Sequence, residues 1–174
     1  RYHFFESFGS TNIDAVISAI RYLALGCDCK YIFLDHISIL VSDQSQGDER
    51  KALDEIATKL KTLTIELNIW LGMVSHSKRP SGKSHEEGGQ TSLSELRGTA
   101  GIGQLSNMVL GLERDGQNPD HTIRNTTLIR VLKNRFSGLT GPSTYLHYDR
   151  DTSRLTETFP DDIEEGIEEF EELT

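Results

Sequence analysis

The first half of the chain alternates short hydrophobic runs with longer stretches in which hydrophobic residues recur at helical spacing. The short runs, at residues 31–34 and 69–74, are bounded by polar residues and have the length of parallel strands covered on both faces. The longer stretches, at residues 13–26 and 48–67, predict amphipathic helices, and the polar triplet Ser-Thr-Asn before the first of them can cap it. Residues 3–8 are expected to end a further strand. This order predicts a right-handed βαβ crossover and therefore an α/β fold with a mostly parallel sheet flanked by helices.

The second half predicts a long loop followed mainly by strands. Residues 77–91 (SKRPSGKSHEEGGQT) have no hydrophobic period, and structureless loops of this length in compact domains are usually functional or disordered. The segments expected after it are a short helix at 92–97, a strand at 108–113, a β-rich run at 126–132 and a strand or hairpin at 143–156.

Composition and charge limit the class of protein. The chain has 174 residues, enough for one compact domain, and it lacks the run of about 20 apolar residues that a membrane span needs. Its net charge is −9, but residues 161–174 hold eight acidic and no basic residues, so the body of the chain is almost neutral. The acidic balance therefore says little about the body's partners. Cys27 and Cys29 are too few for a disulfide framework or a four-ligand zinc site, so we expect reduced thiols.

Two polar residues follow the hydrophobic runs. Asp35 comes directly after residues 31–34, and Ser75-His76 ends the run at 69–74. Because the carboxyl ends of parallel strands share the sheet edge at which α/β proteins bind ligands, we expect Asp35 and His76 to lie side by side. An aspartate there can hold magnesium through its water shell, and the neighbouring strand can present a side chain to a terminal phosphate. Taken singly, a turn-capping Asp35 and a structural His76 are the alternatives.

Several local sequences occur together in one order: IFLDHISILVS, VSHSKRPSGKSHEEGG, SLSELRGTAGIGQLSN, GLER and LKNRFSG, with His76 41 positions after Asp35. Together these features, over about residues 4–150, resemble the helicase half of the bifunctional primase-helicases of short-tailed phages, within the DnaB and Twinkle group of hexameric replicative helicases. The resemblance implies a partial RecA-like P-loop NTPase core at residues 1–158, with a C-terminal β-hairpin, and an acidic tail at 159–174.

The resemblance also implies an activity. Relatives form a homo-hexameric or heptameric ring around single-stranded DNA and use Mg²⁺ and a nucleoside triphosphate, ATP or dTTP, to move 5′ to 3′ and unwind duplex DNA. Asp35 matches the magnesium-holding aspartate, His76 the sensor of the γ-phosphate, and Gln104 a glutamine proposed to couple the nucleotide and DNA sites. For Gln104 the alternative is a cap of the following strand.

Three further residues match positions near the nucleotide, and a fourth lies close to one of them in the sequence. Arg135 matches the arginine finger, which acts on the neighbouring subunit's nucleotide, and Lys133 is expected beside it on the same strand face. Arg114 and Tyr148 match positions that flank the nucleotide base, a role suited to a planar cation and an aromatic ring. A packing role for Tyr148 and an ordinary surface position for Arg135 are the alternatives.

The loop at 77–91 matches the DNA loop of the central channel. Lys78, Arg79 and Lys83 would contact the phosphate backbone there without reading sequence, and Arg97 is a second candidate contact. The alternative is a solvated, mobile loop, because two glutamates dilute its positive charge.

The sequence departs from the family in lacking a G-x-x-x-x-G-K-[ST] run, so the phosphate-binding loop and its lysine are missing. The family places that loop and the catalytic glutamate upstream of Arg1. We therefore expect a longer parent to be the active enzyme and this chain alone to be inactive. Gly103 also stands where close relatives have a basic residue, and the segment 78–83 is one residue shorter.

The tail combines acidic residues with hydrophobic ones at helical spacing. It is expected either to be solvated or to fold on a basic partner, and the acidic tails of relatives contact the replicative DNA polymerase. The resemblance implies a phage-encoded protein in the cytoplasm of the bacterial host, with no membrane partner. Two other functions are open: a recombinase-like ATPase that forms filaments, and a non-catalytic RecA-like adaptor.

Overall fold

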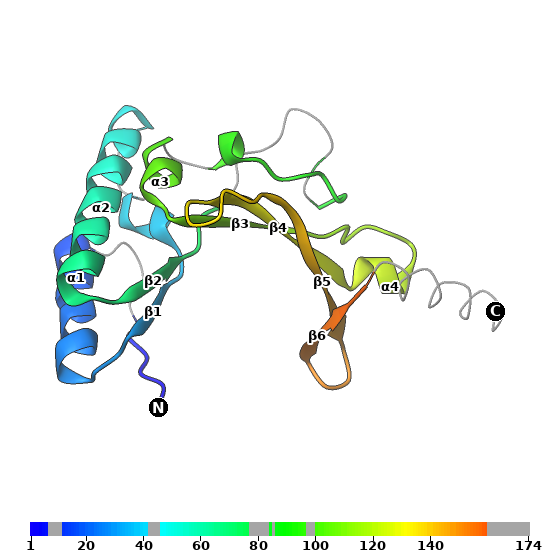
Figure 1. Ribbon diagram of the computed structural model, residues 1–174, viewed down its shortest axis with the longest axis horizontal. Coiled ribbons are helices and arrows are strands. Elements are labelled where there is room, and N and C mark those ends of the chain that lie inside the picture. The colour runs from blue at the N-terminus through cyan, green and yellow to red at the C-terminus, as the bar shows by residue number, and fades with distance from the viewer. Residues whose placement is uncertain (7–11, 42–45, 77–83, 85, 97–99, 160–174) are drawn as a thin grey trace. The chain divides into compact units, whose positions relative to one another are not determined.

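The computed structural model describes residues 1–6, 12–41, 46–76, 84, 86–96 and 100–159 (Figure 1). The chain divides into two compact units. The first comprises residues 1–77 and 96–106, and the second comprises residues 78–95 and those from 107 onward. The sequence predicted one core over residues 1–158 and a tail over residues 159–174, and this division stays a prediction.

The first unit contains a parallel strand pair. Its described elements, in chain order, are α1 (Ile13–Arg21), a π-helical turn (Tyr22–Gly26), β1 (Tyr31–Leu34), a 3-10 helix (Ile37–Val41), α2 (Gln46–Leu67), β2 (Trp70–Met73) and α3 (Ala100–Leu105). β1 pairs with β2 in parallel, with Leu34 opposite Met73. The predicted strand, helix and strand are therefore present with the expected parallel pairing.

Helical spacing produces the core of this unit. Ile37, Leu53 and Leu60 are its largest fully buried side chains, and Ile32 of β1 joins the same cluster. The predicted polar triplet does cap α1, since the side chain of Asn12 accepts a hydrogen bond of 2.8 Å from the backbone N–H of Asp14.

The opposite face of the strand pair is aromatic and exposed. Tyr31 and Phe33 are 75% and 77% exposed. The prediction that residues 31–34 are covered on both faces is therefore wrong for the described chain. Side chains alternate along a strand, and the helices of this unit cover only the face of Ile32. Trp70 lies over Gly72, where a Cβ would come within 2.5 Å of its indole ring, and its ring centroid is 5.1 Å from that of Phe33.

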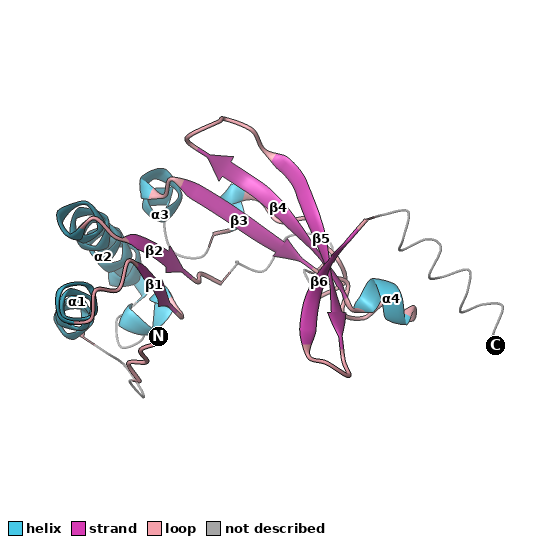
Figure 2. Ribbon diagram, turned by 60° about the horizontal axis from the view of Figure 1, so that its bottom comes forward, coloured by secondary structure: helices cyan, strands magenta, loops and turns pink. Residues whose placement is uncertain are grey.

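The second unit is an antiparallel meander (Figure 2). Its strands are β3 (Met108–Glu113), β4 (Thr126–Asn134), β5 (Gly141–Asp149) and β6 (Arg154–Thr158), and the four-residue helix α4 (His121–Arg124) precedes β4. The predicted C-terminal hairpin is present as β5 and β6. Among the described strands, however, only β1 and β2 are parallel, although a mostly parallel sheet was predicted. The connections after β4 and after β5 are too short for the crossovers that parallel pairing requires, and the connection between β3 and β4 contains only the four-residue helix α4.

Three smaller predictions also differ from the structure. Residues 1–6 contain no strand, and of the predicted helix at 92–97 only a 3-10 turn is present, at Leu93–Glu95. The described part of the predicted loop is tied to the sheet at Glu87, which forms a β-bridge with Asp115. Cys27 and Cys29 are free, as predicted. No described helix combines the length and apolar character that a membrane crossing requires.

A buried carboxylate holds the second unit together. Glu113 is only 8% exposed and accepts hydrogen bonds from the backbone N–H and hydroxyl of Thr91, at 2.7 and 2.8 Å. Arg130 of β4 donates two more, from Nε and Nη2, at 2.7 and 3.0 Å. Thr91 rests on Gly111, where a Cβ would collide with its hydroxyl oxygen. Burial alone would raise the pKa of Glu113, but the bonds from Arg130 and Thr91 hold it below its ordinary value.

We expect Glu113→Gln to destabilise the chain by about 2 kcal/mol at neutral pH, because Arg130 then loses the charge that balances it. The folded-state pKa of Glu113 is depressed, so its contribution is complete above the unfolded value near 4.5 and is lost as the pH falls towards the folded value. Urea titrations at several pH values should therefore show a gap between wild type and variant that closes in acid. The matched control is Glu157→Gln, which removes an exposed carboxylate bonded to Thr144. A gap that does not change with pH would contradict this role.

Candidate nucleotide-sensing edge

The carboxyl edge of β1 and β2 carries the two residues that the sequence singled out. The backbone N–H of Val74 donates to the carbonyl of Leu34 at 3.0 Å, and the N–H of Ile37 donates to the carbonyl of Val74 at 3.1 Å. This ladder extends the parallel register past both strands. Asp35 and His76 are thus brought to the same edge, as predicted.

His36 lies between them and was not singled out from the sequence. Its imidazole ring meets that of His76 edge to face, with 4.5 Å between centroids and 67° between planes. Its Nδ1 is 3.8 Å from Oδ1 of Asp35, which is longer than a hydrogen bond. The sequence did contain one signal for His36: it directly follows Asp35, so it is also expected near this edge of the sheet.

Asp35 has the exposure that a cation-holding carboxylate needs. Its side chain is 77% exposed, against 36% for His36. Within the described ranges no group of three His, Cys, Asp or Glu side chains is arranged to hold a metal ion. A single carboxylate suits magnesium, which keeps several waters and takes its other ligands from phosphate oxygens, whereas imidazole nitrogens suit it poorly. Asp35 therefore fits that ion as one ligand among waters and phosphates.

In the second unit, the end of β4 carries the two cations predicted there. Burial and the nearby positive charge of Arg135 together lower the pKa of Lys133. Lys133 lies in β4, but Arg135 lies in the turn one residue past its end, so the two do not share a strand face as predicted. The N–H of Arg135 donates to the carbonyl of Asn107 at 2.8 Å, while its side chain is exposed. The side chain of Asn134 accepts from the N–H groups of Phe136 and Ser137, which ends the strand in a tight turn.

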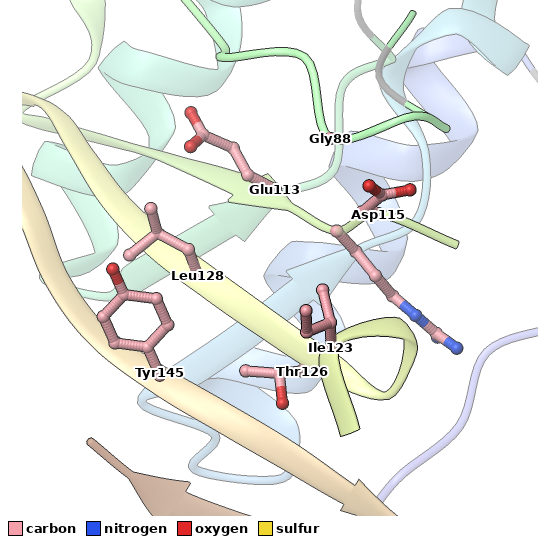
Figure 3. A pocket seen from close by; sticks show the side chains of 8 residues that line it. Gly88, Glu113, Asp115, Ile123, Thr126, Leu128 and Tyr145 are labelled. Carbon is pink, nitrogen blue, oxygen red and sulfur yellow. The ribbon is translucent and has the colours of Figure 1, made fainter. Parts of the chain in front are cut away.

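An open cavity of about 280 Å³ lies on one face of the antiparallel sheet (Figure 3). It is lined by Gly88, Glu113, Arg114, Asp115, Ile123, Thr126, Leu128 and Tyr145. Leu128 is paired directly with Tyr145, so the two side chains share a face, whereas Tyr148 is three residues further along β5 and points to the other face. The structure thus brings Arg114 but not Tyr148 to this cavity. Tyr145 was not singled out from the sequence.

Arg114 is anchored as well as exposed, because its Nε donates to the carbonyl of Arg124 at 2.7 Å. Gln104 lies on α3 with its side chain exposed. The predicted DNA contacts Lys78, Arg79, Lys83 and Arg97 lie outside the described residues, as does the acidic tail.

Comparisons with known proteins identify the family. The profile of the DnaB-like helicase C terminal domain matches residues 3–157. The chain is 39% identical over 155 residues to the DNA helicase/primase of Enterobacteria phage T3, covering 88% of this chain and 27% of that protein. It is 26% identical over 148 residues to a probable plasmid replicative DNA helicase of Chlamydia psittaci, covering 84% of this chain and 31% of the relative.

Solved structures agree at the level of the fold. One of them, described as an ATPase domain, matches with a TM-score of 0.69 and 17% identity, over 89% of this chain and 54% of that one. A DnaB-like replicative helicase, described with its interactions with primase, also matches with a TM-score of 0.69, at 18% identity over 87% of this chain and 37% of that one. The chain spans about a third or less of the curated relatives. By the extent of the profile match and the identity to the phage protein, this chain belongs to the family of DnaB-like helicase C-terminal domains.

Proposed function

We propose that the chain is part of a replicative DNA helicase that couples nucleoside triphosphate hydrolysis to 5′ to 3′ movement on single-stranded DNA and to duplex unwinding. The observation that carries the proposal is the meeting of Asp35, His36 and His76 at the carboxyl edge of the parallel pair. The identity to a phage helicase/primase supports it. The chain spans only part of its relatives, so the proposal concerns the longer parent protein.

The edge is suited to reading a terminal phosphate. The exposed carboxylate of Asp35 would hold Mg²⁺ through the water shell of the ion. The ion would neutralise charge on the phosphates of ATP or dTTP. His76 is exposed at the same edge, and an imidazole N–H there can donate to a γ-phosphate oxygen. Gln104, on α3 of the same unit, is proposed to pass that signal towards DNA.

The second unit supplies groups that suit a nucleotide held by another subunit. The exposed guanidinium of Arg135, with Lys133 next to it, can stabilise charge on a transferring phosphoryl group. Arg114 and Tyr148 are proposed to flank the base. This division favours a ring of six or seven copies, in which each interface joins the edge of one subunit to the arginine of the next.

The remaining partners follow from the same proposal. Lys78, Arg79, Lys83 and Arg97 would track the phosphates of single-stranded DNA, and the acidic tail would contact the replicative polymerase. The protein would act in the cytoplasm of a bacterial host of a phage.

The decisive experiment measures nucleotide hydrolysis by the longer parent, with and without single-stranded DNA, at physiological salt. We expect slow hydrolysis alone and strong stimulation by DNA, because a motor uses nucleotide productively only on its track. The matched control is Asp35→Asn, which removes the carboxylate charge at similar size and should abolish both rates. A correctly folded parent without hydrolysis would instead support the adaptor function.

Complementation tests the role of Arg135 across the interface. Parent subunits with Arg135→Ala and subunits with Asp35→Asn should each be inactive alone. If Arg135 serves its neighbour, co-expression should restore about a quarter of the wild-type hydrolysis, since that share of interfaces in a randomly mixed ring pairs both intact residues. The control mixes Arg135→Ala with the double variant, which should restore nothing. Failure of the first mixture to recover activity would place Arg135 outside the neighbour's site.

The salt dependence of DNA binding tests the loop. Replacing Lys78 and Lys83 of the parent by glutamine should flatten the plot of log affinity against log salt by roughly 1.4, because each phosphate contact on single strands contributes about 0.7. The control replaces Lys51 and Lys59 of α2, which should leave the slope unchanged. An unaltered slope in the first variant would remove these lysines from the DNA site.

A further inference from the structure

The backbone at His36 is anchored at the edge of the parallel pair. The next residue, Ile37, is 1% exposed and belongs to the core of the first unit. Its N–H donates to the carbonyl of Val74, and the N–H of Ile39 donates to the carbonyl of His36 at 3.3 Å, which opens the 3-10 helix. The backbone of His36 is therefore held through its own carbonyl and through the next residue. Its side chain starts from a rigid point at the sheet edge.

His76 sits differently. It follows β2 by three residues, past the last ladder bond at Val74, and its side chain is exposed. An exposed imidazole on a segment that leaves a sheet can adopt several rotamers. The edge-to-face contact with His36, at 4.5 Å between centroids, restricts that choice, since such ring pairs are favourable only in particular geometries.

We propose that His36 is a positioning residue that orients the ring of His76 towards the terminal phosphate of the bound nucleotide. The inference rests on the proposed function, because it assumes that His76 senses that phosphate. His36 acts through ring packing rather than by holding Asp35, whose Oδ1 lies 3.8 Å away, beyond a hydrogen bond. Asp35 thereby stays available to the hydrated magnesium ion, while His36 orients His76.

The test measures how well the longer parent discriminates the terminal phosphate. The readout is the ratio of dissociation constants for a nucleoside diphosphate and a non-hydrolysable triphosphate analogue, both with Mg²⁺, which requires no turnover. His36→Asn, which removes the ring, should lower this ratio about tenfold, the factor expected when one charge-assisted hydrogen bond is lost. His36→Phe keeps an aromatic ring and should stay within about twofold of wild type. The control is His3→Ala, an exposed histidine of the same unit, which should have no effect.

A double-variant comparison shows whether His36 acts through His76. His76→Ala should lower the ratio by itself, and adding His36→Asn should lower it no further, because the orientation of an absent ring cannot matter. A further loss in that background, a normal ratio in His36→Asn, or a greater loss in His36→Phe than in His36→Asn would each overturn the proposal. A normal ratio in His76→Ala would remove the sensor role and the inference with it. Loss of hydrolysis in wild type, by contrast, would count against the motor function alone.

Discussion

The parallel register of β1 and β2 is the constraint on which the functional edge depends. With Leu34 opposite Met73, Asp35 lies one residue past β1 and His76 lies three residues past β2. The bond from Ile37 to Val74 fixes the chain just beyond the two strands. That register is in turn set by burial. Shifting β1 by one residue would exchange buried Ile32 for exposed Phe33 and move every edge residue to the other face. A hydrophobic pattern remote from any ligand thus determines which polar side chains meet.

In the second unit a charged contact has the corresponding role. Glu113 joins β3, β4 and the segment that ends at Thr91, and it is satisfied by four hydrogen bonds. A buried carboxylate with four donors is costly to leave half-paired, so it selects one arrangement of those three segments. β4 continues from Arg130 to Lys133, and Arg135 follows one residue past its end. The position of these two cations is therefore tied to the strand that the Glu113 network holds.

Sequence reasoning succeeded where a pattern is local. Helical spacing gave α1 and α2, and a hydrophobic run ending in Asp35 gave β1 and its edge. It missed what depends on contacts between distant residues. The importance of His36 follows only from its ring contact with His76, which the parallel register makes possible. Glu113 is an ordinary strand acid in the sequence, and only the structure shows that Thr91 and Arg130 bond to it. A mostly parallel sheet was expected, although four strands form an antiparallel meander, because a hydrophobic strand pattern does not state the direction of the strand.

The exposure of Arg135 and His76 is compatible with the roles proposed for them. An exposed guanidinium or imidazole carries little desolvation cost in the separate chain. Its electrostatic interactions are weak there because the surrounding water has a high dielectric constant. Its effect grows when a neighbouring surface and a bound nucleotide exclude water, since the same charge then acts at lower dielectric. Residues that work across an interface should therefore be exposed in one subunit and mounted on rigid elements. The backbone of Arg135, just past β4, is bonded to the carbonyl of Asn107, and the ring contact with His36 restricts the orientation of His76.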